Sequence, residues 1–382
     1  MDFSLSEDEA ALQKLAHDFA TREIQPQAAR FWEEARCPTE ILRQMGELGL
    51  LGLLVPEEWG GAGVSTVGFV AAMEEIGHAD QSIAAAWQAH VTIGSLPILL
   101  NGDDAQRERW LRPLAEGRVL GAFGLTEPTA GSDAAAIKTR AEKVDGGWLI
   151  NGQKAFISNA GTDMSFGVTL LARTGEDDRG RPRFGVFVVE RDTPGYHWGE
   201  KLRGIGWRAL DTRELFFDDV LVPDDHVLGD PSGGLAKFLG TLDVGRISIA
   251  ALSTSLAQAV FDLALDYAKM REQFGQPISK HQAIQFKLAD LATEIEACRW
   301  LTYRAAALRD AGEPFRKEAA IAKLRASKTA MWAATEAVQI HGGYGYMMES
   351  EVSRFFCDAK VLAIGEGTNE IQHLVIAREL GC

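Results

Sequence analysis

The spacing of hydrophobic residues divides the chain into three zones, and the first is predicted to be helical. From Ser4 to about residue 114, apolar residues recur at helical intervals. Ser4, with Glu7 three residues later, resembles a helix-capping box at the start of this zone. A loop with Pro56 and a glycine cluster follows, and helical patterns then resume over residues 67–77 and 84–100.

The second zone, residues 119–222, is predicted to be a β domain. Short apolar or alternating runs are separated by Gly, Pro, Asp and Asn, with no helix-length periodic stretch between them. Asp145-Gly146 and Asn151-Gly152 have the composition of hairpin turns. Because no helices separate the strands, antiparallel pairing is favoured over parallel βαβ units.

The third zone is helical again from about residue 233. Leu252, Leu256 and Val260 follow one face of a long predicted helix, and further helical patterns cover residues 282–308, 314–340 and 369–380. The predicted fold class is therefore α+β, with three domains at residues 1–118, 119–228 and 229–382.

Composition and charge narrow the classes of function. The 382 residues are 46% hydrophobic and 24% charged, which is ordinary for a globular chain with a large core. A net charge of −15 makes nucleic acid a poor partner, because phosphate backbones are repelled. The four cysteines are scattered without CxxC spacing, so neither a metal site nor a disulfide scaffold is indicated.

The sequence shows no sign of export or of a membrane. The first nine residues are acidic and lack an apolar stretch, unlike a signal or transit peptide. No uninterrupted apolar run approaches the length that spans a bilayer. A cytoplasmic protein without a membrane partner is expected.

Two segments have the composition of a chemical site, whereas the usual dinucleotide and phosphate loops are absent from the sequence. Residues 125–133 combine hydroxyls with free backbone amides at the exit of an apolar strand, and could hold a polar ring edge or a phosphate. An ordinary polar turn is the alternative.

The second segment is residues 364–371, in which Glu366 lies between two glycines after an apolar run. Thr368 is a natural N-cap for the helix that follows. A carboxylate against apolar surroundings can have its pKa raised toward that of a working base. A solvated loop glutamate is the alternative.

Together these segments resemble the acyl-CoA dehydrogenase family over essentially the whole chain, most closely its short-chain members. The resemblance implies a helical N-terminal domain, a middle antiparallel β-barrel and a C-terminal four-helix bundle. Six motifs in the family's order carry it, at residues 55–61, 126–133, 151–159, 271–275, 339–345 and 366–379.

The resemblance also implies FAD, bound without a covalent link, and assigns positions around it. Positions beside the isoalloxazine ring are matched by Phe123, Leu125, Thr126, Phe156 and Ser158. Positions that reach the cofactor of the neighbouring subunit are matched by Arg271, Phe274, Gln339 and Gly343. Thr368 and Glu370 match positions near the ADP half, and Ser132 and Arg246 match contacts to the CoA portion of the thioester.

Glu366 matches the family's catalytic base, which takes the α-proton of an acyl-CoA while the β-hydride passes to flavin N5. The product is a trans-2-enoyl-CoA, as in fatty acid β-oxidation. Some members carry the base on the first long helix of the C-terminal domain, but that position is Gly245 here. The resemblance further implies a homotetramer, built as a dimer of dimers, and an electron-transferring flavoprotein as electron acceptor.

Two departures from the family pattern bear on the substrate. Many members have a tyrosine where this chain has Gly365, so a short but wide acyl group, branched or cyclic, is expected. Cys357 stands where the family often has arginine. Drift with local repacking is the alternative for both.

Related activities share these motifs. A dehydrogenase of acyl groups on a carrier protein and an acyl-CoA oxidase on the same fold stay open. A nitroalkane-type flavoenzyme is disfavoured because the base is Glu366 and not aspartate, and a DNA-binding relative because no basic tract is present.

Overall fold

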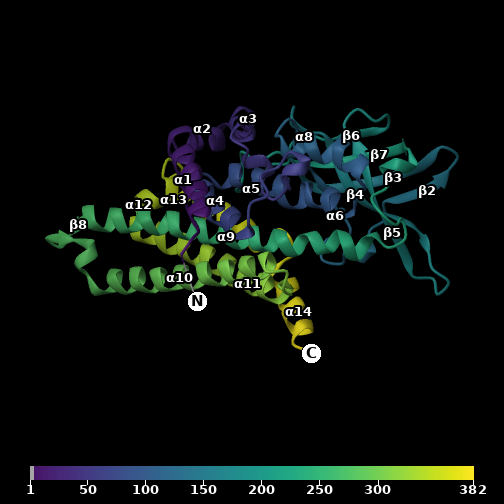
Figure 1. The fold of residues 1–382 in the computed structure, drawn as a ribbon. Helices are drawn as coiled ribbons and strands as arrows, with labels where there is room; N and C mark the ends of the chain where they lie inside the picture. The colour runs from purple at the N-terminus through teal and green to yellow at the C-terminus, as the bar shows by residue number, and fades with distance from the viewer. Residues whose placement is uncertain (1–3) are drawn as a thin grey trace.

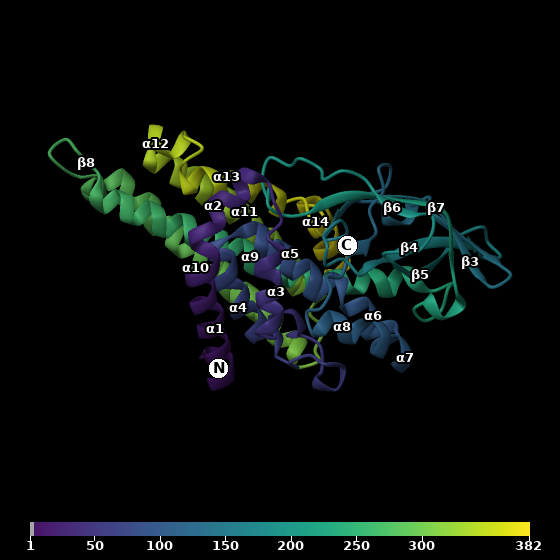
Figure 2. The ribbon, with the colours of Figure 1, turned by 90° about the horizontal axis from the view of Figure 1, so that it is seen from above.

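The computed structural model describes residues 4–382 (Figure 1). The β domain lies at one end of the molecule, and long helices extend from it to the other end (Figures 1 and 2). Residues 1–3, the start of the predicted first domain, lie outside the described residues. The N-terminal helices are α1 (Glu7–Phe19), α2 (Ala28–Glu34), α3 (Thr39–Glu47), α4 (Thr66–Ala79), α5 (Gln81–Ala89), α6 (Leu96–Asn101), α7 (Asp104–Gln106) and α8 (Arg112–Ala115).

The capping box of α1 is formed by Ser6 and Glu9, so the prediction of Ser4 and Glu7 was wrong. The Ser6 hydroxyl accepts from the Glu9 backbone N–H at 3.3 Å, and the Glu9 carboxylate accepts from the Ser6 N–H at 2.9 Å. Glu9 also accepts from the Ser65 hydroxyl at 2.5 Å. This contact with the start of α4 favours the later cap.

The helix predicted over residues 84–100 is interrupted by a π-helical turn, His90–Gly94, between α5 and α6. The His90 ring accepts a hydrogen bond from the Gly121 N–H at 2.9 Å, and its other nitrogen lies 3.2 Å from the Leu51 carbonyl. Burial lowers the pKa of His90 to about 4. The neutral ring therefore connects the N-terminal helices to the start of the β domain.

The β domain is a seven-stranded sheet in the order β1-β4-β2-β3-β7-β6, with β5 paired to β4. Most neighbours are antiparallel, as predicted, but β1 and β2 each pair with β4 in parallel. Asp145-Gly146 does turn between β2 and β3. The strands are β1 (Phe123–Gly124), β2 (Arg140–Val144), β3 (Gly147–Ser158), β4 (Gly167–Glu176), β5 (Pro182–Glu190), β6 (Tyr196–Trp198) and β7 (Thr212–Val222).

The prediction of a second hairpin turn at Asn151-Gly152 was wrong, because these residues lie inside β3. The register against β7 shifts between Ile150 and Gly152, which marks an irregularity within one continuous strand. Gly152 has φ +151°, and a Cβ there would lie 2.5 Å from the Thr139 hydroxyl oxygen. The glycine therefore permits a close approach of neighbouring strands without ending β3.

The C-terminal helices pack around α9, a helix of 37 residues. By length and composition, α9 and the stretch Gln81–Asn101 could cross a membrane, but 78% and 83% of their most apolar windows are buried inside the protein. Core helices of a globular protein give the same result. The C-terminal elements are α9 (Gly234–Met270), β8 (Glu272–Gln273), β9 (Gln276–Pro277), α10 (Gln282–Asp310), α11 (Arg316–His341), α12 (Gly343–Tyr346), α13 (Glu351–Leu362) and α14 (Asn369–Glu379).

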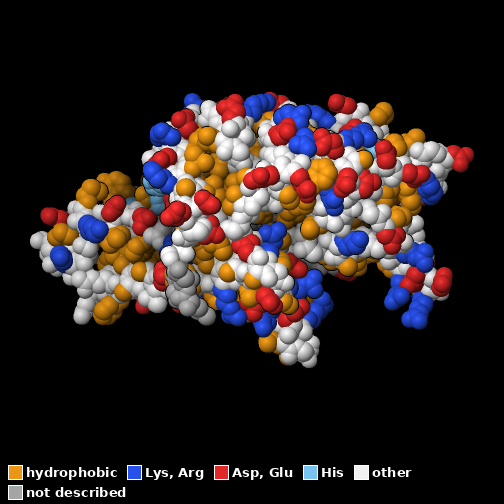
Figure 3. Space-filling view, viewed as in Figure 1, with side chains coloured by type: hydrophobic (Ala, Val, Ile, Leu, Met, Phe, Trp, Pro, Cys, Tyr) orange, Lys and Arg blue, Asp and Glu red, His pale blue; other side chains and the backbone are white. Residues whose placement is uncertain are grey.

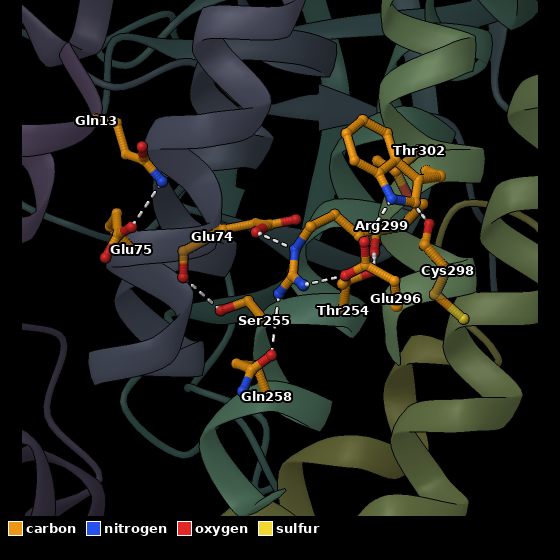
Figure 4. A network of polar contacts seen from close by, with 12 residues as sticks. Gln13, Glu74, Glu75, Thr254, Ser255, Gln258, Glu296, Cys298, Arg299 and Thr302 are labelled. Carbon is orange, nitrogen blue, oxygen red and sulfur yellow. Dashed lines mark hydrogen bonds and ion pairs between the residues drawn. The ribbon is translucent and has the colours of Figure 1, made fainter. Parts of the chain in front are cut away.

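A polar network joins α4 to the C-terminal helices α9 and α10 (Figure 4). The Arg299 guanidinium donates to Glu74 and to Gln258, each at 3.0 Å. The Ser255 hydroxyl donates to the Glu74 carbonyl at 2.7 Å. Because the Glu74 side chain is largely buried, this pairing helps fix how the first and third domains meet.

A second buried cluster joins α5 to α13. Arg354 donates to Asp80, the N-cap of α5, at 2.8 Å, and both side chains are almost fully buried. Asp358 accepts from the Trp207 backbone N–H at 2.6 Å and from the Trp32 indole at 3.2 Å. Burial raises the pKa of Asp358 to about 7, and the nearby Asp80 acts in the same direction.

We predict that Arg354→Met destabilises the fold strongly, because it leaves the buried carboxylate of Asp80 without its cation. The expected loss is roughly 3–5 kcal/mol, measured by urea denaturation. Arg325→Met removes an exposed ion pair with Glu294 and should change stability by no more than about 1 kcal/mol. Equal effects of the two variants would contradict this account.

Candidate active site

Glu366 lies on the short loop between α13 and α14. Its backbone is in the left-handed region, with φ +52°, and Gly367 follows at φ +91°. A non-glycine residue in this region is strained, and such strain persists only where the surroundings fix the conformation. Thr368 caps α14 as predicted, since its hydroxyl accepts from the Ile371 N–H at 3.4 Å.

The loop is fixed through its backbone by α11 and α14. The buried ammonium of Lys323 donates to the Gly367 carbonyl at 2.8 Å and to the Asn369 side chain at 3.3 Å. Gln372 donates to the same Gly367 carbonyl at 2.8 Å. Burial lowers the pKa of Lys323 to about 8.

The Glu366 carboxylate itself has no hydrogen-bond partner among the described residues, although both of its oxygens are buried. Burial raises its pKa to about 7, and the side chains of Gln88, Lys323 and Arg246 act against this rise. A carboxyl group with this pKa exchanges its proton near neutral pH, as a general base must.

The carboxylate lies directly against Gly245 on α9. A Cβ at that position would be 1.6 Å from Glu366 Oε2 and 3.3 Å from the Ile93 side chain. The space that a side chain at position 245 needs is therefore occupied by the carboxylate.

Arg246 on α9 is close enough to Glu366 to act on it electrostatically, and its contact with the CoA portion stays a prediction. Its guanidinium is buried and paired with Asp243 on the same helix, and Asp243 also accepts from Arg316 at 3.0 Å. Its Nε atom is buried without a partner among the described residues. The charge of Arg246 favours the ionised form of the base and lowers its pKa.

The predicted flavin-edge residues gather where β3 meets the loop after β1. The Ala155 N–H donates to the Thr126 carbonyl at 2.8 Å. The register of β3 shifts between Lys154 and Ile157, and within this bulge Phe156 has φ +61° and is 68% exposed. A bulge redirects side chains, so the aromatic ring stands outside the sheet beside the half-buried Thr126 and Ser158.

A buried ion pair holds the loop after β1 against β3, next to the residues predicted to bind the flavin. Lys154 donates to Glu127 at 2.9 Å and to the Leu125 carbonyl at 3.1 Å, with both charged groups buried. Burial lowers the pKa of Lys154 to about 8, against the effect of Glu127. Phe123 and Leu125 are buried just before the loop, and Phe123 stacks on Phe238 of α9 with ring centroids 3.9 Å apart.

The remaining predicted residues are spread over the molecule. Ser132 is exposed on the loop after β1, and Glu370 is exposed in the first turn of α14. Arg271 and Phe274 belong to the hairpin at the far end of α9. Gln339 and Gly343 lie near the same end, where Tyr267 of α9 stacks on His341 of α11. In Figure 1, β8 and α12 lie at the end of the molecule away from the β domain, apart from α14, which begins just after Glu366.

The sequence analysis did not identify the polar side chains near Glu366, among them Lys323 and Gln88. Lys323 and Gln88 each interrupt a run of small or apolar residues that becomes a buried helix face. A single polar residue in such a run was the available signal. Cys357, noted as a departure, lies on α13, where burial raises its thiol pKa and so disfavours the reactive thiolate.

These features fit a flavin cofactor: an exposed aromatic side chain on a bulge, hydroxyls beside it, and a buried carboxyl group without a partner among the described residues. The arrangement is compatible with the flavin-dependent dehydrogenase type that the sequence resemblance implies.

Comparison with known proteins identifies the family. The chain matches "Acyl-CoA dehydrogenase, N-terminal domain" over residues 6–118, the middle domain over 122–220 and the C-terminal domain over 232–381. It is 46% identical over 380 residues to "Probable acyl-CoA dehydrogenase YngJ" of Bacillus subtilis (strain 168), covering 100% of both chains. The chain belongs to the acyl-CoA dehydrogenase family.

Two solved structures show the same fold. Butyryl-CoA dehydrogenase from Megasphaera elsdenii matches with a TM-score of 0.97 at 40% identity, covering 100% of both chains. An acyl-CoA dehydrogenase complexed with FAD, from Bacillus anthracis, matches with a TM-score of 0.92 at 31% identity, covering 99% of this chain and 68% of that one. The protein is accordingly an acyl-CoA dehydrogenase with FAD as its cofactor, and the predicted family and three-domain fold are confirmed.

We predict that Glu366→Gln stabilises the protein at alkaline pH. The carboxyl is neutral in folded and unfolded chains below its ordinary pKa of 4.5, whereas above about 7 the folded chain must hold a buried charge without a partner. Each tenfold difference in proton affinity between the folded and unfolded chains corresponds to about 1.4 kcal/mol of stability. The melting temperature of the variant should therefore exceed that of the wild type at pH 8 and equal it at pH 4.

The matched control is Glu379→Gln, which removes an exposed carboxylate at the end of α14. This variant should show no comparable pH-dependent gain. A Glu366→Gln melting temperature that follows the wild type across the pH range would contradict the assignment of a buried charge without a partner.

Proposed function

We propose that the enzyme dehydrogenates a short or short-branched acyl-CoA across Cα–Cβ, with Glu366 as the base. The observation that carries the proposal is the Glu366 carboxyl group, buried without a hydrogen-bond partner among the described residues and with a pKa near 7. Its charge is not used in any ion pair with the described residues, so it is available to a substrate.

The arrangement of the loop supports proton abstraction. Lys323 and Gln372 bind the backbone beside Glu366 and leave its carboxylate free to receive the α-proton. The Glu366 N–H makes no hydrogen bond to the described residues, so it can donate to the thioester carbonyl as negative charge develops there. Proton removal at Cα needs this help, because an unassisted thioester is a far weaker acid than a glutamic acid.

FAD, when bound, supplies the acceptor for the hydride that leaves Cβ, so that the double bond forms without an added oxidant. In the proposed arrangement, Thr126 and Ser158 bind the ring edge while Phe156 covers it. Lys154 and Glu127 hold the supporting loop in place. We propose an electron-transferring flavoprotein as the subsequent acceptor, as the family resemblance implies.

The acyl group is inferred from Gly365. A Cβ at this position would contact only the Val361 carbonyl, at 3.6 Å, so the space that a larger side chain would take is open. Gly365 does not share the positive φ of Glu366 and Gly367, the two residues after it, so other residues can adopt its backbone conformation. We therefore propose a pocket that accepts a short acyl chain with a branch or ring.

Assembly with further copies of the chain is proposed from the far end of the bundle. Phe274 is 94% exposed at the tip of the β8–β9 hairpin, and Met270, Tyr344 and Tyr346 are exposed nearby in the sequence or on α12. Apolar side chains are visible on this end of the surface (Figure 3). A homotetramer in which this end reaches the cofactor of a neighbouring subunit would cover these residues.

The proposal is tested by adding straight, branched and cyclic short acyl-CoAs to the oxidised enzyme without oxygen and following the visible flavin absorption. Bleaching is expected, and Glu366→Gln should lower its rate by roughly a hundredfold to ten-thousandfold while FAD stays bound. Glu379→Gln serves as the control. Bleaching at the wild-type rate by Glu366→Gln would exclude this base, and an absence of bleaching by every acyl-CoA in the panel would contradict the proposed substrate.

The width of the pocket is tested with Gly365→Tyr. The added ring should lower flavin reduction by a branched acyl-CoA at least roughly tenfold relative to reduction by butyryl-CoA, the size of effect expected for a methyl-sized clash. The ratio of the two rate constants divided by their substrate dissociation constants is the measurement. An unchanged ratio would mean that position 365 does not line the acyl pocket.

A further inference from the structure

The polar neighbour of the catalytic carboxylate on α5 is Gln88. This side chain is only 4% exposed, on a helix whose other members are mostly apolar. Its amide lies between two hydroxyl groups and Glu366. Ser248 Oγ of α9 is 2.8 Å from Gln88 Oε1 and Thr92 Oγ1 is 3.3 Å from it, while the amide also approaches the carboxylate without closing a hydrogen bond.

The two hydroxyls can serve the amide either as donors or as acceptors. Ser248 Oγ is also 2.7 Å from the Gly245 carbonyl, and Thr92 Oγ1 is 2.7 Å from the backbone carbonyl of Gln88. A hydroxyl has one hydrogen, so it donates either to the amide oxygen or to the backbone carbonyl. If both donate to the backbone, their oxygens accept from the amide NH2 group.

Each arrangement presents a different group to the base. With the hydroxyls as donors, the amide oxygen is occupied and the NH2 group faces Glu366. With the hydroxyls donating to the backbone, the amide is turned by about 180° and its oxygen faces Glu366. The terminal torsion of glutamine is broad, so both orientations are sterically accessible.

During one turnover Glu366 needs first the NH2 group and then the oxygen of the amide facing it. As a carboxylate it accepts hydrogen bonds, and after taking the α-proton it becomes an acid that must donate one. We propose that Gln88 is a positioning residue for Glu366 whose amide turns its NH2 group toward the carboxylate and its oxygen toward the protonated acid. This inference rests on the proposed role of Glu366 as the base.

The charged groups around the base cannot serve both states in this way. Lys323 on α11 and Arg246 on α9 are donors only, and they are engaged with the loop backbone and with Asp243. Asp243 is in turn paired with Arg316, and Glu370 of α14 faces Lys323. Among the described residues that act on Glu366, Gln88 is the one with both a donor and an acceptor.

The test compares Gln88→Met with Gln81→Met in the FAD-bound enzyme. Gln81 is a fully buried amide on the same helix that donates to the Gly77 and Leu252 carbonyls, so its loss matches the structural effect of losing Gln88. Gln88→Met should lower the rate of flavin reduction roughly tenfold, the effect of one ordinary hydrogen bond, with substrate dissociation changed less than about twofold. Its pH–rate profile should move to higher pH, since the nearby Gln88 amide lowers the pKa of Glu366 and the variant lacks this effect. Gln81→Met should leave the profile in place.

Infrared spectroscopy reads the acid state without turnover. The carboxyl band of protonated Glu366, assigned by subtracting the Glu366→Gln spectrum, should be that of a hydrogen-bonded acid in the wild type and move toward an unbonded acid in Gln88→Met. An unbonded acid in the wild type would overturn the inference even if the variant failed to fold. So would equal effects of Gln88→Met and Gln81→Met. A Glu366→Gln enzyme that still reduces its flavin would instead overturn the proposed function.

Discussion

A carboxylate buried without a partner among the described residues is the constraint on which the C-terminal half of the site depends. Placing such a group away from water is unfavourable, and an ordinary protein interior would neutralise it with a close cation. Here the cations that act on it are directed elsewhere: Lys323 to the loop backbone and Arg246 to Asp243. The loop therefore keeps its shape through main-chain contacts, while the Glu366 carboxylate stays without an ion-pair partner among the described residues, as its proposed role as the base requires.

The β domain likewise uses one set of residues to hold the backbone and leaves another free for the ligand. Lys154 and Glu127 form a closed, buried pair that fixes the carbonyl of Leu125 and the loop after it. Phe156, two residues along β3, is turned outward by a bulge. At the Glu366 loop and at the loop after β1, the buried charged side chains bind backbone carbonyls. The groups proposed to meet the ligand are the unpaired Glu366 carboxylate and the exposed Phe156 ring. Rigid support of this kind is what precise positioning of reacting groups requires.

Much of the architecture could be predicted from the sequence because hydrophobic periods are local signals. The change from helical spacing to short alternating runs and back placed the three zones, and Thr368 was recognised as the cap of α14. The errors arose where a contact distant in sequence decided the outcome. Glu9 is drawn into the cap of α1 by Ser65, and the turn-like Asn151-Gly152 stays within β3 because the strand continues beside β7. Lys323 and Gln88 could not be assigned to Glu366, since their proximity exists only in the folded chain. The apolar run before Glu366 marked it as a candidate, but a solvated loop glutamate fits the same pattern, and the family resemblance favoured the base.

The contact between Glu366 and Gly245 has an evolutionary consequence. Family members place the base either on this loop or on the helix position that is glycine here, and a Cβ at 245 would lie 1.6 Å from the Glu366 carboxylate. Because the atom met is the far end of a flexible side chain, a residue gained at 245 would turn the Glu366 carboxylate away from its present position. Losing Glu366 first would remove the proposed base. The two positions are therefore coupled, since a side chain at 245 and the present placement of the Glu366 carboxylate exclude each other.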